Sequence, residues 1–304
     1  MSRSGKKPPV TTRSGFVVAS FGRQFTVELQ DGTLITCVTR GKRTDLACGD
    51  HVNVALTGSD QGVIETIAPR TSLFYRSDVQ REKLIAANVT QIVIVLAVAP
   101  PFHAELLDRC LAAAEEAGIP ALLALNKMDL PTAPAALHGL DLYRGLGYAV
   151  LPLAAKIDIA PLRERLANHT SVLVGQSGMG KSTIINRLLP GAAARVGELS
   201  AALGGGRHTT THARLYHLDV ASHIIDSPGL QEFGLVHVEP ESLAHDFVEF
   251  RPHLGQCKFN DCKHLTEPGC AITAAVERGE IAAPRLASYR TLVSQLLKKR
   301  QRWE

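Results

Sequence analysis

Eight residues near the middle of the chain have the types and spacing of a phosphate-binding loop. Residues 175–182, Gly-Gln-Ser-Gly-Met-Gly-Lys-Ser, match the pattern GxxxxGK[ST] between a strand predicted over Ser171–Val174 and a helix predicted over Ser182–Leu189. Glycines let successive backbone N–H groups face phosphate oxygens, and the helix N-terminus adds partial positive charge. The pattern predicts that a nucleotide's phosphates contact Gly175, Gln176, Ser177, Gly178, Met179, Gly180, Lys181, Ser182 and Thr183. The alternative is a glycine-rich structural turn.

Two side chains of this loop carry specific chemistry. Lys181 is expected to reach the β and γ phosphates, and the hydroxyl of Ser182 is expected to ligate Mg²⁺. Asp226-Ser-Pro-Gly229 follows a strand predicted over His223–Ile225 and adds a carboxylate for the Mg²⁺ shell. The backbone N–H of Gly229 is expected to meet the γ-phosphate.

Asn126-Lys127-Met128-Asp129 follows a buried strand predicted over Pro120–Leu125, at the sheet edge where ligands bind in open α/β folds. The Asp129 carboxylate can accept both the N1–H and the N2–H₂ of guanine. Adenine offers neither donor and would leave the carboxylate unpaired, so an ATPase is set aside. Alone, this tetrapeptide is weak and more often a surface turn, but beside a phosphate loop it indicates guanine.

A glycine tract, residues 204–206, leads into Arg207-His208 and the hydroxyls of Thr209, Thr210 and Thr211. A threonine here could coordinate Mg²⁺ only when the γ-phosphate is present, which defines a switch loop. We expect Thr210 or Thr211 to take that role. An ordinary Gly/Thr loop is the alternative.

Three cysteines and one histidine stand within fourteen residues near the C-terminus. The set Cys257, Cys262, His264 and Cys270 supplies the four ligands of a closed tetrahedral zinc site. With no open coordination position, the zinc is expected to be structural; coincidental buried cysteines are the alternative. Cys37, Cys48 and Cys110 are scattered and are expected to be small core residues.

Elements of three kinds must position these residues. The chain has 304 residues, with 45% hydrophobic and 20% charged residues, which suits two or three folded domains and excludes a wholly disordered chain. We expect a disordered basic arm over residues 1–14, an OB-type β-barrel over 15–71, a doubly wound α/β domain over 72–238 and a helical zinc-binding domain over 239–304. The barrel strands are predicted over Gly15–Ser20, Gln24–Leu29, Thr33–Val38, His51–Leu56 and Gly62–Ile67.

The α/β domain is predicted from buried strands that alternate with helical periodicity. Strands are expected over Gln91–Ala99, Pro120–Leu125, Tyr148–Leu153 and Ser171–Val174, with a helix over His103–Gly118. After about Val238 strands are expected to disappear. Two short helices and a basic helix end, Lys298–Arg302, are expected to follow the cysteines.

The motifs occur in an unusual order. In common GTPases the phosphate loop comes first and Asn-Lys-x-Asp last, whereas here residues 126–129 precede residues 175–182 and the Asp226–Gly229 motif comes last. The same sheet is obtained if the old termini are joined and the chain is opened after the Asp-x-x-Gly segment. Such permutation is tolerated because domain termini usually lie at the surface.

With these motifs the chain resembles the RsgA (YjeQ) family of circularly permuted GTPases. The likeness runs from about Ser14 through the cysteine cluster and includes Ile85-Ala-Ala-Asn88. It implies a GTPase stimulated by the small ribosomal subunit during late maturation, a barrel that contacts ribosomal RNA, and zinc on the four Cys/His positions. The family usually has serine as the first residue of Ala154-Ala155-Lys156; the N–H of Ala155 is expected to meet guanine O6.

The group that positions the attacking water is less obvious. Leu230 stands where Ras-like enzymes have glutamine and has no hydrogen-bonding group. His237 lies seven residues further along, and the resemblance places a candidate catalytic histidine here. His208 and Gln231 are alternatives, as is a histidine that only fixes the domain junction. Lys181, Thr210, Thr211 and His237 are thus the expected catalytic residues.

The remaining sequence features concern partners and location. The net charge of +4 allows a nucleic-acid partner without requiring one, and the loop of Arg40, Lys42 and Arg43 is either an RNA contact or a solvated basic loop. The longest apolar run, Ile92–Ala99, is far short of a membrane span. We expect a cytoplasmic monomer that binds GTP or GDP, Mg²⁺ and one Zn²⁺. A rival function is a nucleotide-gated RNA- or ribosome-binding module in which hydrolysis is incidental.

Overall fold

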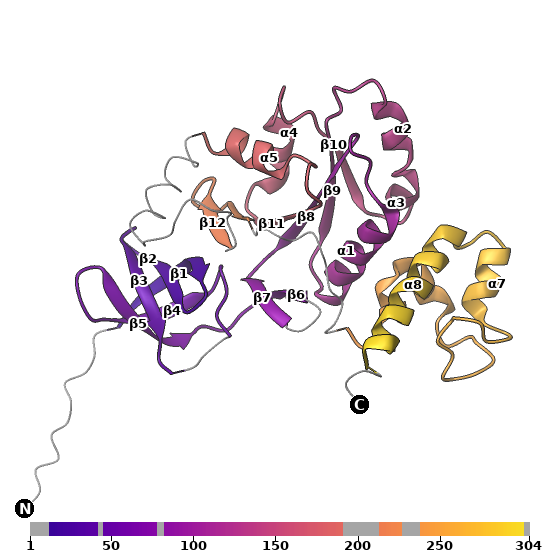
Figure 1. The fold of residues 1–304 in the computed structure, drawn as a ribbon, viewed down its shortest axis with the longest axis horizontal. Coiled ribbons are helices and arrows are strands. Elements are labelled where there is room, and N and C mark those ends of the chain that lie inside the picture. The colour runs from indigo at the N-terminus through magenta and orange to yellow at the C-terminus, as the bar shows by residue number, and fades with distance from the viewer. Residues whose placement is uncertain (1–11, 42–44, 78–81, 191–212, 227–237, 301–304) are drawn as a thin grey trace, which may run out of the picture.

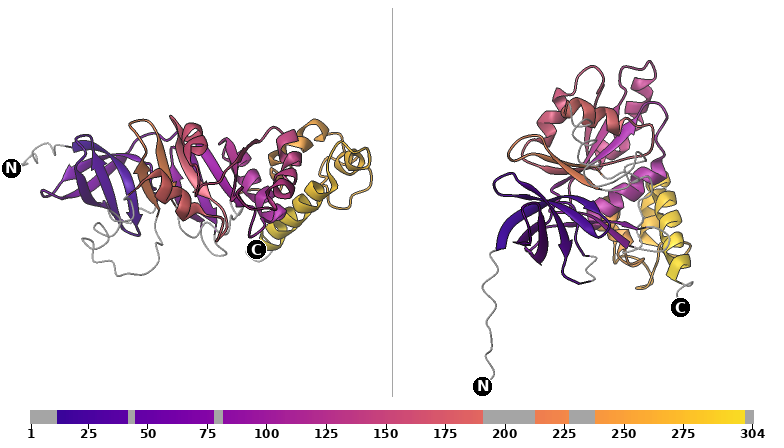
Figure 2. Two further views of the ribbon diagram at one scale, coloured as in Figure 1. Left: turned by 90° about the horizontal axis from the view of Figure 1, so that it is seen from above. Right: turned by 60° about the vertical axis from the view of Figure 1, so that its left-hand side comes forward.

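The computed structural model describes residues 12–41, 45–77, 82–190, 213–226 and 238–300, and the structural statements below refer to these residues. A barrel, a central sheet with helices on both faces, and a helical C-terminal unit lie in a row (Figures 1 and 2). The strands are β1 (Thr12–Phe21), β2 (Gln24–Leu29), β3 (Leu34–Thr39), β4 (His51–Leu56), β5 (Gln61–Ile67), β6 (Leu73–Ser77), β7 (Glu82–Ala87), β8 (Gln91–Ala97), β9 (Ala121–Asn126), β10 (Ala149–Pro152), β11 (Thr170–Val174), β12 (Arg214–His217) and β13 (His223–Asp226). The helices are α1 (Ala104–Glu116), α2 (Ala133–His138), α3 (Asp141–Gly145), α4 (Ala160–Leu166), α5 (Lys181–Leu188), α7 (Ala271–Glu277) and α8 (Ala283–Arg300), with 3₁₀ turns η1 (Leu243–Asp246) and η2 (Val248–His253).

The predicted five-stranded barrel is confirmed. Its strands pair in the order β1-β2-β3-β5-β4, and β1 also pairs with β4, which closes the barrel. Alternate residues such as Val17, Val27 and Ile64 point into its core. Strand β1 begins at Thr12, three residues before the predicted start of the barrel, and its backbone pairs with β4 from Thr12 onward. These residues are polar, so no apolar pattern marked them as strand.

The central sheet follows the predicted α/β pattern. Strands β10-β9-β8-β11-β13 are parallel, and β12 adds an antiparallel edge. Helix α1 packs on one face, while α4 and α5 cover the other (Figure 1). Strand β8 is buried from Ile92 to Ala97, as expected for a strand covered on both faces. Strand β12 and the β6–β7 hairpin are additions that the sequence did not predict.

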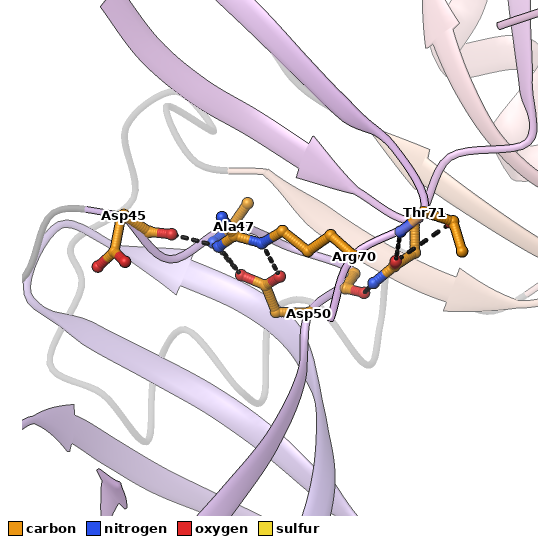
Figure 3. A network of polar contacts seen from close by, with 7 residues as sticks. Asp45, Ala47, Asp50, Arg70 and Thr71 are labelled. Atoms are coloured by element: carbon orange, nitrogen blue, oxygen red, sulfur yellow. Dashed lines mark hydrogen bonds and ion pairs between the residues drawn. The ribbon is translucent and has the colours of Figure 1, made fainter. Parts of the chain in front are cut away.

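The barrel and the central sheet are continuous through their edges. Strand β1 pairs with β12 at Ala19 and Arg214, so that eleven strands form one sheet. A polar network lies where the chain leaves the barrel, between the end of β5 and the start of β6 (Figure 3). There Arg70 donates to both carboxylate oxygens of buried Asp50 at 2.7 and 2.8 Å, and Asp50 also accepts the Ala47 N–H at 2.8 Å.

The C-terminal unit packs against the α1 face of the sheet. As expected, no strand occurs among its described residues, 238–300. The expectation of two short helices is wrong for the second, because α8 runs for 18 residues and includes the first part of the basic tail. Burial of Tyr289, Leu292 and Val293 explains its length, since these side chains stay in the core over successive turns. None of the described helices is both long and apolar enough to cross a membrane.

Candidate nucleotide site and metal cluster

The predicted phosphate loop connects β11 to α5, at the carboxyl edge of the parallel sheet. Two of its glycines are required by close backbone approach. Gly175 has φ +147°, and a Cβ there would lie 2.3 Å from the carbonyl oxygen of Val95. Gly180 has φ +99°, and a Cβ there would lie 2.4 Å from Nδ2 of Asn126. The loop therefore depends on glycine both for its own shape and for its packing on the residue 126–129 segment.

Asn126 and Lys127 join the two predicted nucleotide-binding motifs. Asn126 is buried, and its Nδ2 donates to the carbonyl of Met179 at 3.0 Å. The Lys127 ammonium donates to the carbonyl of Gly178 at 2.7 Å and to that of Ala99. Neither side chain points away into solvent as it would in a surface turn. The motif that would read a base is thus bonded directly to the loop that would hold phosphates.

The Ala155 N–H has a different partner from the one expected. It donates to Oδ1 of Asn126 at 3.1 Å, so it faces this side chain and not the position of a base. Ala155 is buried, whereas the next residue, Lys156, is exposed. One buried amide side chain therefore links three loops, and the expected contact of Ala155 with guanine O6 would require that link to open.

A cavity of about 290 Å³ lies between these loops. Its lining combines the predicted residues Asn126, Lys127, Asp129, Gly180 and Thr183 with the unpredicted Ala99, Leu130 and Lys156. Asp129 is exposed on this lining. Lys156 could have been found from its place in the Ala154–Lys156 motif, and Ala99 from its place just after β8. Met128 helps to shape the turn, because its N–H donates to the carbonyl of Leu153 at 3.1 Å.

Lys181 and Asp226 form the charged part of the site. The Lys181 ammonium donates to the carbonyls of Gly175 and, at 2.8 Å, Gln176. Burial lowers the pKa of Lys181, and the nearby Asp226 carboxylate partly opposes this shift. Burial likewise raises the pKa of Asp226, with Lys181 in opposition. Burial therefore disfavours the charged form of both groups, and each charge partly offsets that cost for the other.

The other predicted loop residues divide into two groups. Ser177 and Ser182 are exposed at the phosphate loop, and Gln176 is half-buried. Predicted residues that lie outside the described part of the chain are Thr210, Thr211, Gly229 and His237, together with the alternatives His208 and Gln231.

The predicted metal ligands meet in the C-terminal unit. The ligand atoms of Cys257, Cys262, His264 and Cys270 all lie within 4.8 Å of one another. The three sulfur atoms lie 3.5, 3.6 and 3.4 Å from Nδ1 of His264. A tetrahedral zinc with bonds of about 2.3 Å to sulfur and 2.0–2.1 Å to nitrogen requires sulfur–nitrogen separations of about 3.5 Å. The donor set therefore fits zinc in both chemistry and spacing.

Helix α8 supports the loop that carries these ligands. The Tyr289 hydroxyl donates to the carbonyl of Lys263 at 3.0 Å, and Nε of Arg290 donates to the carbonyl of His264 at 3.1 Å. The Ala271 N–H points at the sulfur of Cys257 at 3.3 Å, a contact that favours the thiolate. Such outer contacts orient metal ligands and stabilise their charged forms.

Comparison with known proteins agrees with this geometry. The family model described as RsgA GTPase matches residues 67–236, more than half of the chain. The chain belongs to the RsgA family of GTPases. A relative from Nitrosomonas europaea, named small ribosomal subunit biogenesis GTPase RsgA, is 53% identical over 302 residues, 98% of this chain and 96% of that protein. A relative of the same name from Neisseria gonorrhoeae is 49% identical, covering 92% of each chain.

Two solved structures match nearly the whole of this chain. YjeQ from Thermotoga maritima matches with a TM-score of 0.73 and 32% identity, over 94% of this chain and 99% of that one. YloQ, described as a circularly permuted GTPase, matches with a TM-score of 0.70 and 26% identity, over 95% and 96% of the two chains. The permuted GTPase fold inferred from the motif order is thereby confirmed.

Proposed function

We propose that this GTPase hydrolyses GTP to GDP and phosphate in response to the small ribosomal subunit, and acts in the late assembly of that subunit. The observation that carries the proposal is the direct bonding of Asn126 and Lys127 to the phosphate loop, which makes one site from two motifs. The names of the relatives from Nitrosomonas and Neisseria support the ribosomal role.

Guanine is read at the cavity between the three loops. The Asp129 carboxylate accepts the N1–H and N2–H₂ of the base, while Asn126 and Lys127 keep the base-reading segment against the phosphate loop. Because the Ala155 N–H bonds to Asn126, the exposed Lys156 beside it is the better-placed residue to meet the O6 edge. Hydrogen bonds that only guanine can complete supply the selectivity.

The phosphates and Mg²⁺ neutralise the two partly buried charges of the site. Lys181 leaves its loop carbonyls to meet the β and γ phosphates, and the backbone of residues 175–183 cradles their oxygens. Ser182 and Asp226 are the residues that would hold Mg²⁺, which when bound offsets charge on the phosphate oxygens. The raised pKa of Asp226 is consistent with a carboxylate that needs a cation.

Hydrolysis requires an oriented water molecule beside the γ-phosphate. We assign this role to His237, with Thr210 or Thr211 completing the Mg²⁺ shell and the Gly229 N–H meeting the γ-phosphate. An imidazole can orient water or accept its proton near neutral pH. The assignment rests on sequence position and family resemblance.

The C-terminal cluster holds one structural zinc, and the barrel contacts ribosomal RNA. All four positions around the metal are taken by Cys257, Cys262, His264 and Cys270, which leaves none for a reactant. Arg40 lies on the barrel and is three-quarters exposed, in keeping with a phosphate contact. We propose that the protein works in the cytoplasm as a monomer.

Phosphate release by the full-length protein tests the proposal. Turnover of GTP, ATP and xanthosine triphosphate is measured with and without purified small ribosomal subunits. We expect GTP to be preferred and its turnover to rise strongly with subunits. Asp129→Asn should shift the preference toward xanthosine triphosphate, because the amide can donate to the 2-oxo group of that base.

The rival function, a nucleotide-gated binding module, predicts a different result in the same assay. Subunits would then bind in a nucleotide-dependent way without raising turnover. An unchanged base preference in Asp129→Asn would contradict the base-reading assignment. The conservative variant Asp158→Asn, in the exposed turn before α4, serves as the control for loss of one nearby carboxylate.

A further inference from the structure

The β12–β13 hairpin lies between two parts of the nucleotide machinery. In chain order, β12 follows the Gly/Thr tract of residues 204–211, and β13 ends at Asp226. The cross-strand pairs run from Arg214–Asp226 at the site end to His217–His223 at the far end. Strand β13 also pairs with β11, which leads into the phosphate loop. A change in the position of this hairpin is therefore felt directly at Asp226.

The barrel holds the site end of the hairpin through backbone and apolar contacts. Ala19 of β1 pairs with Arg214, and the Ser20 N–H donates to the carbonyl of Ala213 at 3.3 Å. The Leu215 side chain is buried in a core that also includes Val18 and Cys48 of the barrel. This attachment is short, because only one residue pair joins the two strands in register.

A second attachment holds the far end of the hairpin. Nε2 of His217 lies 2.6 Å from the Glu28 carboxylate of β2, and Nδ1 of His217 lies 2.9 Å from Nδ1 of His223. A consistent proton arrangement has His217 donating to Glu28 and accepting the Nδ1–H of His223. Burial, and next to it His217, lower the pKa of His223, which favours this neutral partner.

The space beside this second attachment is not packed. A cavity of about 550 Å³ lies there, lined by Phe16, His51, His217, Val220 and His223 among others. Phe16 stacks on the ring of His51 with centroids 4.7 Å apart, and Val220 at the hairpin turn is fully exposed. Apart from the Phe16 ring, whose centroid lies 5.9 Å from that of His223 and 6.4 Å from that of His217, the Glu28–His217 contact is what restrains this end of the hairpin against the barrel.

We propose that Glu28 and His217 are positioning residues that couple the barrel to the nucleotide site by fixing the β12–β13 hairpin at two points. One point of attachment is a hinge, whereas two transmit a rotation. A nucleotide that shifts Asp226 then shifts the barrel, and a partner that moves the barrel biases the nucleotide site by the same factor. The inference rests on the proposed role of Asp226 at the nucleotide.

The expected size of the effect follows from exposure of the contact. The side chains of His217 and Glu28 are 40% and 28% exposed, so their interaction is worth at most about 1 kcal/mol, or about fivefold in an equilibrium. Loss of the contact should therefore weaken the coupling without unfolding either part.

Hydrogen–deuterium exchange of the full-length protein tests the coupling without any partner. Amide exchange is compared between saturating GDP and saturating guanylyl imidodiphosphate. In the unaltered protein we expect the β1 and β2 amides to differ about fivefold between the two nucleotides. In Glu28→Gln and in His217→Gln the barrel difference should fall below twofold, while the β13 amides still respond.

The control and the contrary outcomes separate coupling from simple stabilisation. Glu65→Gln removes another barrel ion pair, that with Arg40, and should keep the full nucleotide-dependent difference. A contact that is only structural would change exchange equally in both nucleotides, which would overturn the inference. So would an unaltered protein that binds both nucleotides with no barrel difference. Failure to bind guanine nucleotides at all, measured separately by titration, would instead refute the proposed function and the inference with it.

Discussion

The junction between barrel and central sheet relies on backbone groups and neutral polar contacts, whereas the junction between sheet and C-terminal unit relies on buried charges. At the first, Asn88 donates to the carbonyl of Gly49 at 2.8 Å, and the Glu28–His217 contact is partly exposed; the buried ion pair Arg70–Asp50 lies within the barrel segment and not between barrel and β12. At the second, Arg285 of α8 donates to Asp108 of α1 at 2.6 Å and to Glu249 at 2.5 Å. The first junction contacts β12, which pairs with the strand that ends in Asp226; the second lies on the α1 face.

The difference indicates different mechanical roles. Arg285 is 1% exposed and its guanidinium also lies 4.4 Å from the centre of the Phe247 ring, so any rotation at this junction would strand a buried charge. Backbone pairing of β1 with β12 involves no buried charge and tolerates small rotations. The C-terminal unit is therefore expected to move with the sheet as one body, and the barrel to move relative to it.

The largest effect is expected when the C-terminal unit loses its fold, because the buried charges of the second junction are then lost with it. Cys262→Ser removes one of the four proposed zinc ligands, and in small metal units the metal-binding free energy, about 10 kcal/mol or more, is folding free energy. We expect loss of zinc by elemental analysis and rapid amide exchange beyond about residue 240, with GTP binding retained. Cys37→Ser, a buried barrel cysteine away from the cluster, is the control. Pure unaltered protein without zinc would contradict this prediction.

Arg285→Ala tests the buried charges themselves. It leaves Asp108 and Glu249 buried without their cation, which should reduce the free energy of unfolding by about 3–5 kcal/mol. Arg251→Ala removes a more exposed pair at the same junction, Arg251–Glu115, and should lose about 1 kcal/mol or less. The free energy of unfolding of both variants is measured by urea titration, with the loss of helix and strand followed by far-ultraviolet circular dichroism. Equal losses would mean that the buried charges of this junction stabilise it no more than its exposed ion pair does.

His237 lies one residue before Val238, which is buried in the core shared by the sheet and the C-terminal unit. If it orients the attacking water, His237→Ala should slow subunit-stimulated turnover about 10²-fold or more, with GTP and subunit affinities near those of the unaltered protein. If it only fixes the junction, stability would fall and stimulated turnover per folded molecule would remain. Measuring kcat beside urea unfolding distinguishes the two roles.

The smallest effect concerns pH at the second junction. Burial, and then the neighbouring Glu116 carboxylate, raise the pKa of Asp246 to about 8. The folded protein thus holds a proton that the unfolded chain releases above about pH 4. Stability from this group is fully present at low pH and is lost as pH rises toward and through about 8.

Asp246→Asn is neutral at every pH and should remove this dependence. In urea unfolding we expect it to differ least from the unaltered protein below about pH 4, to be more stable by about 1 kcal/mol one pH unit higher, and to gain further as pH rises toward 8. Glu277→Gln, on the exposed end of α7, is the matched control. A stability difference between Asp246→Asn and the unaltered protein that does not vary with pH would argue against a proton bound to Asp246 in the folded protein.

The elements that sequence predicted best are those with a single strong signal. The apolar run of β8 and the glycine spacing of residues 175–182 each allow one structure, and both were located to within two residues. Strand β12 was missed because four residues, Arg-Leu-Tyr-His, are too few to show alternation, and one of its two partner strands, β1, lies in the barrel. Arg285 could not be recognised as buried, because a lone arginine in a helix normally indicates a solvated face.

In the candidate site, likewise, sequence predicted which motif residues lie together but not all of the hydrogen bonds between them. Motif spacing brought Asn126, Lys127 and Lys181 to one place, since parallel strands end at a common edge. The hydrogen bond from Ala155 to Asn126 depends on the relative height of two loops, which no local pattern encodes. The Cys/His cluster was predictable from its residue types alone, but its support by Tyr289 and Arg290 required the packing of α8.

The pairing of Ala19 with Arg214 also affects the order in which the parts of the protein can fold during synthesis. The barrel strand leaves the ribosome first, and its partner follows 195 residues later (214 − 19), which is about 10–40 s at ordinary elongation rates. During that time the β1 edge near Ala19 has no strand beside it. The irregular register of β1 against β2 between Val17 and Ala19 twists this edge, which discourages pairing with another nascent chain. The barrel can thus wait, folded and unjoined, until the GTPase sheet is complete.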